Sequence, residues 1–274
     1  MAVVLEAAGL CHTFLGAQGK LKALDGIDIG VSKGEFVAIV GPSGCGKSTL
    51  LRILGGLVVP TRGTVRLDGR PLRSPQRKVS YVFQSLSLLP WRTVLRNATL
   101  PLEVAGAASS QCTARAREML SLVGLDRFEG AFPRELSGGM AQRVAIARAL
   151  VADPEVLLLD EPFGALDALS REQMNMELMR IWQARQVTAV MVTHDLEEAV
   201  FVADRVLVMS PRPGQIRAEV LVDLPRPRTI EVTYTEYFGA MTRRVRDALG
   251  PQATGQPEGE GSPLPPGRVA CRMK

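Results

Sequence analysis

Cysteine is scarce in this sequence, and the segments that would carry a protein into or across a membrane are missing. Its four cysteines are scattered and none belongs to a C-x-x-C pair, which favours reduced thiols in a cytosolic protein. No stretch approaches the roughly 18 consecutive apolar residues that a membrane-spanning helix needs. The first residues, MAVVLEAAGLCHTF, lack the basic region and the cleavage site of a signal peptide. We therefore expect a soluble protein of the cytosol.

The sequence also lacks a strong excess of charge of either sign. Its net charge is +5, and 46% hydrophobic with 22% charged residues is ordinary for a globular protein. Several arginines fall in the second half of the chain: Arg226, Arg228, Arg243, Arg244 and Arg246. They could form a basic surface for nucleic acid or anionic lipid, but a solvated face is the simpler interpretation. Because no basic stretch is interleaved with aromatic residues, we expect no nucleic-acid partner.

The most informative stretch is a glycine-rich segment that follows a short apolar run. Residues 36–40 read FVAIV, and the next nine are Gly41, Pro42, Ser43, Gly44, Cys45, Gly46, Lys47, Ser48 and Thr49. This G-x-x-x-x-G-K-[ST] pattern predicts a buried strand, a tight loop and a helix from near Lys47, whose backbone N–H groups converge on phosphate. We expect Lys47 to reach the β- and γ-phosphates and Ser48 to hold Mg²⁺. A chance glycine-rich turn is the alternative, and the helical pattern that follows argues against it.

Two carboxylates follow a second apolar run. Residues 156–159 are all apolar and precede Asp160 and Glu161. A fully apolar run is typical of a parallel strand that is buried on both faces. Carboxylates at its end, beside a phosphate loop, predict a Mg²⁺ ligand in Asp160 and a water-activating base in Glu161. A surface acidic turn is the alternative.

A second helix start also lacks bulky side chains. Ser137, a strong N-cap residue, precedes Gly138 and Gly139, and apolar residues then recur with helical spacing from Met140 to Leu150. This leaves a helix N-terminus that an anion can approach. Taken alone, the segment is equally explained as an ordinary capped helix.

Three further polar or aromatic residues are candidates by position. Gln84 ends a predicted strand over residues 78–83, and His194 ends another over residues 187–193. The carboxyl ends of strands in an α/β sheet are where ligands bind, although a strand cap and a structural histidine are the ordinary alternatives. Phe14 is expected on a loop before the second strand. There it would stack on a purine or pack in the core, and its spacing does not decide between them.

The patterning divides the chain into parts of different character. Residues 3–40 predict several short antiparallel strands, with turn signals at Gly9 and at Asp25-Gly26. Residues 85–135 read as an all-helical insert, with helices over 92–104, 111–123 and 126–132. A tail begins at residues 225–229, holds one helix over 234–248, and is Pro/Gly-rich and expected to be disordered over 251–274.

We expect an α/β fold with a P-loop NTPase core, in which a mixed or parallel sheet is flanked by helices. An antiparallel β subdomain and the all-helical insert complete one domain over residues 1–250.

Taken in order, these motifs resemble a known family. The set GPSGCGKST, Gln84, LSGGM, VLLLDE, ALD and THD is similar to the ATP-binding subunit of ABC transporters. The likeness is greatest to bacterial importers of nitrate, taurine and aliphatic sulfonates and covers about residues 3–245. Finer cues are VFQ with LLPW shortly after it, and the stretch HDLEEAVFVADRVLVMSPRPGQI. Met140 departs from the family, whose commonest motif has glutamine there.

The resemblance implies a role for each motif. Phe14 would stack on adenine, residues 41–49 would bind the phosphates, and Ser48 and Asp160 would hold Mg²⁺. Gln84 would sense Mg²⁺ and the attacking water and link to the membrane partner. Ser137, Gly138 and Gly139 would contact ATP bound to the opposite subunit, and Asp167 would lie in an inter-subunit loop. Glu161 would be the general base, and His194 would contact the γ-phosphate.

The same resemblance implies partners and a location. Two copies of the chain would enclose ATP, and the helical insert would receive a short helix of an integral membrane permease at the cytoplasmic face of the bacterial inner membrane. A periplasmic or extracellular solute-binding protein would take part indirectly. The first alternative is a soluble ABC ATPase of DNA repair or translation, which usually has a long coiled-coil insert or two cassettes. A P-loop kinase or GTPase, the second, would lack the S-G-G segment. The cargo is not encoded in this chain.

Overall fold

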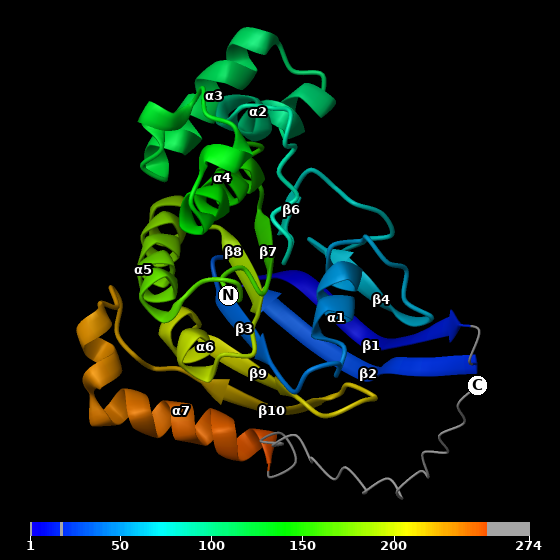
Figure 1. Cartoon of the computed structure of the whole chain (residues 1–274). Helices are drawn as coiled ribbons and strands as arrows, with labels where there is room; N and C mark the ends of the chain where they lie inside the picture. Colours follow the sequence, from blue (N-terminus) through cyan, green and yellow to red (C-terminus); the bar gives the residue numbers. More distant parts are fainter. Residues whose placement is uncertain (1, 17–18, 251–274) are drawn as a thin grey trace, which may run out of the picture.

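Two β-sheets form the framework of the computed structural model, which describes residues 2–16 and 19–250 (Figure 1). The larger sheet has six strands in the order β10-β9-β3-β8-β7-β6, and all neighbours are parallel except β10 and β9. Its strands are β3 (Phe36–Val40), β6 (Val79–Val82), β7 (Val156–Asp160), β8 (Thr188–Val192), β9 (Arg205–Met209) and β10 (Ile216–Leu221). The predicted tail over 251–274 lies outside the described residues.

The smaller sheet is antiparallel, with the strand order β2-β1-β4-β5. Its strands are β1 (Val3–Gly16), β2 (Gly19–Ser32), β4 (Arg62–Leu67) and β5 (Arg70–Pro71). The helices are α1 (Lys47–Leu54), α2 (Val94–Val104), α3 (Ser109–Leu122), α4 (Gly138–Leu150), α5 (Ala168–Arg185), α6 (Leu196–Val202) and α7 (Glu236–Leu249). The predicted fold class, a mixed sheet with helices and a separate antiparallel sheet, is confirmed.

Apolar strands hold the layers together. Every residue of β3, β7 and β8 is buried. In β3, Phe36 and Ala38 face one core, shared with α4, α5 and α6, whereas Val37 and Ile39 face a second core, shared with α1 and the antiparallel sheet. Because successive side chains of a strand point to opposite faces, an unbroken apolar run is required where both faces are covered. The prediction of buried parallel strands from these runs is confirmed.

The antiparallel pairing predicted within residues 3–40 is confirmed, but the prediction of several short strands is wrong for the part before β3. The structure has two strands of 14 residues, β1 and β2, which pair antiparallel with register shifts. Gly9 and Gly26, which look like turn signals in the sequence, lie at these shifts with φ of +57° and +63°. A bulge, like a turn, favours glycine with positive φ, so the sequence signal is the same for both. As a result Phe14 lies within β1, and not on a loop as predicted.

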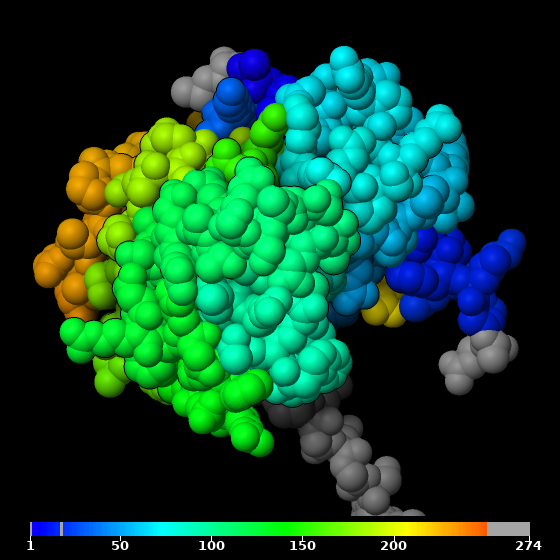
Figure 2. All heavy atoms as spheres, turned by 90° about the horizontal axis from the view of Figure 1, so that it is seen from above, coloured from blue at the N-terminus to red at the C-terminus, as the bar shows by residue number. Residues whose placement is uncertain are grey.

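All regular secondary structure between residues 85 and 135 is helical. It contains α2, α3 and two 3-10 turns, Asp126–Phe128 and Pro133–Glu135, and the part predicted as a helix over 126–132 has only the first of these turns. Fully buried Asn97 fastens the apolar turn before α2, because its amide bonds both backbone groups of Leu89 and the carbonyls of Arg92 and Thr93. The helices pack on α4. They stand at the top of Figure 1 and form the near face in Figure 2.

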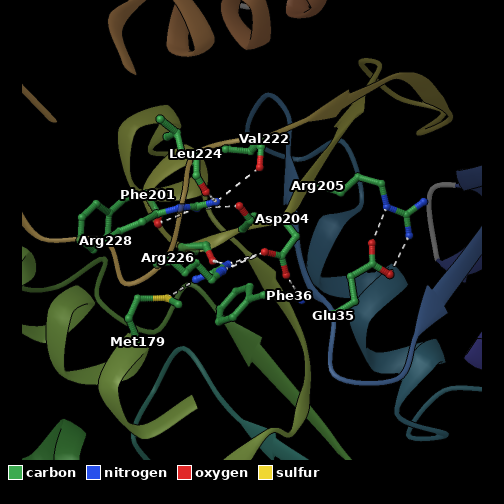
Figure 3. Close-up of polar contacts among 12 residues, drawn as sticks. Glu35, Phe36, Met179, Phe201, Asp204, Arg205, Val222, Leu224, Arg226 and Arg228 are labelled. Atoms are coloured by element: carbon green, nitrogen blue, oxygen red, sulfur yellow. Dashed lines mark hydrogen bonds and ion pairs between the residues drawn. The ribbon is translucent and has the colours of Figure 1, made fainter. Parts of the chain in front are cut away.

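Two of the arginines that the sequence analysis places on the surface are structural instead (Figure 3). Arg228 is 6% exposed, and its guanidinium donates to five backbone carbonyls: those of Val200, Phe201, Ala203, Val222 and Leu224. Three of these carbonyls end α6 and its continuation, where helical carbonyls have no partner within the helix. Arg226 pairs with Asp204 at 2.7 Å and lies over the ring of Trp182 at 4.3 Å. The segment 225–229 therefore fastens the C-terminal part, ending in α7, to α6.

Candidate functional site

The phosphate loop joins β3 to α1 and leaves that helix without a side-chain cap. Gly46 precedes α1 with φ of +109°. A Cβ there would lie 2.9 Å from Leu24 Cδ2 and 3.1 Å from the carbonyl oxygen of Ala23. Both the backbone conformation and the space thus require glycine at this position. The first N–H groups of α1 remain available to an anion, as the sequence predicts.

Lys47 places its charge inside this loop. The residue is 6% exposed, and its ammonium donates to the carbonyl oxygens of Gly41 at 2.8 Å and Pro42 at 3.2 Å. Cys45, which lies in the same loop, is buried, and burial raises the pKa of its thiol. The ammonium and the helix N-terminus together make the loop strongly favourable for negative charge.

Asp160 is the centre of a small network at the end of β7. It is 1% exposed, and its two oxygens accept hydrogen bonds from Ser48 Oγ at 2.7 Å and from the Tyr81 hydroxyl at 2.8 Å. Burial, and then the nearby Asp160 carboxylate, raise the pKa of Tyr81 far above its ordinary value, so its hydroxyl stays a donor at neutral pH. Sequence reasoning missed Tyr81. Its position in the strand that neighbours β7 is informative only once the strand order is known.

The carboxylate of Glu161 contacts two other residues, and all three follow neighbouring strands. Its Oε2 accepts a hydrogen bond from Gln84 Nε2 at 3.2 Å and lies 3.3 Å from His194 Nδ1. Gln84, Glu161 and His194 come after β6, β7 and β8, which are adjacent in the sheet. Glu161 has a φ of +44°, which is strained for a residue with a side chain, and its N–H donates to Val192. Such strain accumulates at functional positions, and here it directs the carboxylate toward its two partners.

Residues 137–139 lie elsewhere on the molecule. Ser137 caps α4, and its hydroxyl accepts a hydrogen bond from Met140 N at 3.3 Å, so the predicted N-cap is confirmed. Ser137, Gly138 and Gly139 line a hollow of about 460 Å³ together with Leu166 and Asp167. A different hollow, of about 510 Å³, is lined by Gly41, Pro42, Ser43 and His194. Within one chain the structure therefore does not bring the S-G-G segment to the phosphate loop.

The structure defines the surroundings of Phe14 and Met140, whose roles the sequence left open. Phe14 is 43% exposed and touches His12 edge-on, with ring centroids 4.5 Å apart, so it is not a core residue. Met140 is partly buried and packs against the core between α4 and its neighbours. Met140 thus contributes apolar contact with the core, and Gly138 and Gly139 still line the hollow at the start of α4.

Comparisons with known proteins agree with these features. The family model for ABC transporters matches residues 24–164. The chain is 49% identical to the nitrate import ATP-binding protein NrtD of Synechocystis over 81% of this chain and 83% of the relative. It is 50% identical to the taurine import ATP-binding protein TauB of Rhizobium johnstonii over 74% and 78%. A dimeric structure of the ATP-binding cassette MJ0796 in a post-hydrolysis state, bound to ADP and Pi, superposes with a TM-score of 0.71 at 33% identity, covering 81% of this chain and all of that one.

Proposed function

We propose that this chain, which belongs to the ABC transporter family, is the ATP-hydrolysing subunit of a bacterial importer for nitrate, taurine, an aliphatic sulfonate or a related small solute. The observation that carries the proposal is the approach of Gln84 and His194 to one carboxylate oxygen of Glu161, beside a phosphate loop. The described residues include no long coiled-coil insert of the kind expected for repair or translation ATPases. We assign residues 1–250 to the ATPase domain and about 85–135 to its helical subdomain.

In this proposal the loop 41–49 binds the phosphates of ATP and Phe14 stacks on the adenine. Lys47 and the first N–H groups of α1 neutralise the β- and γ-phosphates. A Mg²⁺ ion fits oxygen donors from Ser48, Asp160 and Gln84. No group of three or more His, Cys, Asp or Glu side chains in the described part of the chain forms a metal cage. This suits an ion that is bound through one carboxylate and the nucleotide phosphates, where it would offset their charge.

Glu161 acts as the general base. Its carboxylate takes a proton from water, the water oxygen attacks the γ-phosphorus, and the bond to the β-phosphate oxygen breaks to give ADP and phosphate. Gln84, which donates to the same carboxylate, orients the water, and His194 contacts the γ-phosphate. All three residues follow neighbouring strands of the larger sheet, so their side chains can act on the same water.

The site is completed by a second copy of the chain. Residues 137–139 and the phosphate loop line separate hollows in one chain, so the N-terminus of α4 reaches ATP only in a partner. Its positive end faces the γ-phosphate and favours the closed dimer. Loss of that phosphate removes the attraction, and the population shifts to the open state. Asp167, in the same hollow as Ser137, lies between the two copies.

Integral membrane permease subunits are the further partners that we propose. Within the described residues no helix is both long and apolar enough to cross a bilayer, and the related subunits are named for import of solutes. The outer surface of α2 and α3 (Figure 2) receives a short permease helix at the cytoplasmic face of the inner membrane. A periplasmic or extracellular solute-binding protein delivers the cargo to the permease.

Two measurements on the purified full chain test this function. Mg-ATP turnover is expected, and the chain is expected to co-purify with a polytopic membrane protein encoded beside it. Turnover that rises with added nucleic acid but not with the permease would favour a repair or translation ATPase. Absence of both turnover and permease binding would overturn the proposal.

A further inference from the structure

Arg171 joins two loops that the mechanism uses separately. It lies in the first turn of α5, and its Nη2 donates to the carbonyl oxygen of Leu166 at 3.0 Å. Its Nη1 donates to Asp195 Oδ2, also at 3.0 Å. Leu166 belongs to the 164–167 segment that lines the hollow of the S-G-G residues, whereas Asp195 directly follows His194. One planar guanidinium therefore spans both loops.

Asp195 connects this guanidinium to the backbone on both sides of His194. Its other oxygen caps α6 by accepting from the N–H groups of Glu197 and Glu198 at 3.0 and 3.1 Å. Its own N–H donates to Thr193 Oγ1 at 3.0 Å, and Thr193 N donates to Ile39 O in the strand that leads to the phosphate loop. The backbone on both sides of His194 is thus held, and Asp195 is where Arg171 acts on it.

The Arg171–Asp195 pair also forms the wall between two hollows. Both residues line the hollow that contains Gly41 and His194, and both line a smaller cavity of about 140 Å³ with Asn175 and Glu198. Their side chains are 26% and 28% exposed, so the pair is less screened than an ordinary surface ion pair. A charged contact in this position sets where the histidine loop lies relative to the phosphate loop.

We propose that Arg171 is a positioning residue that couples the 164–167 segment to His194. This inference rests on the proposed function and adds to it a route between the two nucleotide sites of the dimer. A second copy of the chain that contacts Asp167 moves the Leu166 carbonyl, and Arg171 carries that displacement through Asp195 to the γ-phosphate contact. Displacement of a catalytic group by about 1 Å lowers a rate by about 100-fold.

The test separates binding from turnover in variants of the full chain. Arg171→Ala is expected to lower kcat by about ten- to a hundredfold and to leave the Kd for ATP unchanged, because the loop 41–49 and Phe14 are untouched. Arg171→Lys keeps the charge but cannot bridge two acceptors in one plane, so an intermediate kcat is expected. Arg180→Ala is the matched control. Arg180 lies on the same helix and also pairs with a carboxylate, Glu177, and a carbonyl, Leu122, away from both loops.

A double-mutant cycle tests whether Arg171 acts through Asp195. Asp195→Asn keeps the oxygen that caps α6 but loses the charge facing Arg171, and it is expected to lower kcat without further loss in the double variant. A folded Arg171→Ala variant with the kcat of the wild type would overturn the inference, as would equal losses of kcat and ATP affinity. If Arg171→Ala does not fold, Asp195→Asn decides alone, and a normal kcat in it has the same consequence.

His194→Ala distinguishes failure of this inference from failure of the proposed function. If His194→Ala lowers kcat and Arg171→Ala does not, only the coupling is wrong. If the wild-type chain does not hydrolyse ATP, or His194→Ala turns over normally, the proposed site itself is wrong.

Discussion

The hydroxyl of Ser48 donates a hydrogen bond of 2.7 Å to Asp160, a residue 112 positions further along the chain. Ser48 lies in the first turn of α1, which begins at Lys47, and Asp160 is the last residue of β7. The pair places a hydroxyl and a carboxylate, both suited to Mg²⁺, beside Glu161, the residue that we propose as the base. The chemistry that we propose for the site depends on this contact between the start of a helix and the end of a strand.

Replacing Glu161 with Gln should separate ATP binding from hydrolysis. The amide preserves the size of the side chain and a polar contact for Gln84, but it accepts no proton from water. We expect ATP binding and a stable dimer, with turnover reduced by at least about 100-fold. Phosphate release and light scattering measure the two effects. Glu6→Gln, at an exposed position of β1, is the control, and undiminished turnover in Glu161→Gln would exclude Glu161 as the base.

Replacing Ser137 with Arg should prevent ATP-driven dimerisation. A long cation at the N-terminus of α4 fills the hollow beside Gly138 and Gly139 and opposes the positive end of the helix. In the Glu161→Gln background, light scattering is expected to find a monomer with Mg-ATP. Ser109→Arg, at the exposed first residue of α3, should leave the dimer intact. A normal dimer with Ser137→Arg would contradict a site shared between two copies.

Gly46→Ala should abolish ATP binding and lower stability. The new Cβ meets Leu24 and Ala23 at a position with φ of +109°, and we expect a loss of about 1–3 kcal/mol in the free energy of unfolding. Gly69→Ala is the matched control, because its φ is +71° but nothing lies within 4 Å of the added Cβ. It should lose some stability and keep ATP affinity. Equal ATP affinity in both variants would show that the loop tolerates a side chain at Gly46.

Arg228→Ala should destabilise the protein without touching the nucleotide site. Its removal leaves five backbone carbonyls without their donor, and we expect a loss of about 3–5 kcal/mol, measured by urea unfolding. Arg228→Lys should recover little, because a single ammonium cannot reach all five carbonyls. Arg243→Ala, exposed on α7, should be close to neutral. A loss for Arg228→Ala no greater than for Arg243→Ala would refute the structural role.

Glu198 should make stability fall as pH rises. Burial raises the pKa of its carboxyl to about 7 in the folded chain, although a hydrogen bond with Thr193 lowers it. The unfolded chain then releases its proton near the ordinary pKa of 4.5 while the folded chain keeps it, so folding weakens between about pH 4.5 and 7 by about 3 kcal/mol. Above about pH 7 Glu198 is ionised in both the folded and the unfolded chain, and it no longer makes the free energy of unfolding depend on pH.

Glu198→Gln tests this dependence because glutamine stays neutral at every pH. Relative to the wild type, the variant should gain thermal stability between pH 5 and pH 8, as measured by the shift in Tm at each pH. Parallel Tm profiles for the two proteins would show that Glu198 does not titrate in this range.

Several features of this protein depend on neighbouring residues alone, and the sequence by itself determined them. The loop of residues 41–49 is one continuous segment whose glycines and lysine act on the local backbone. The cap at Ser137 and the unbroken apolar strand before Asp160 are also local patterns. The strand ends that hold Gln84 and His194 follow from the same periodicity.

Only the tertiary structure decided which of these segments meet. Glu161 contacts Gln84 and His194 because β6, β7 and β8 are neighbours, and strand order is set by packing between distant parts of the chain. Tyr81 and Arg171 could not be predicted for the same reason, because their partners lie far away in sequence. Arg226 and Arg228 were wrongly placed on the surface because their partners, too, are known only from the tertiary structure. The periodicity of apolar residues predicts which face of a helix or strand a side chain lies on. Its partners from distant parts of the chain are determined only by how the layers pack.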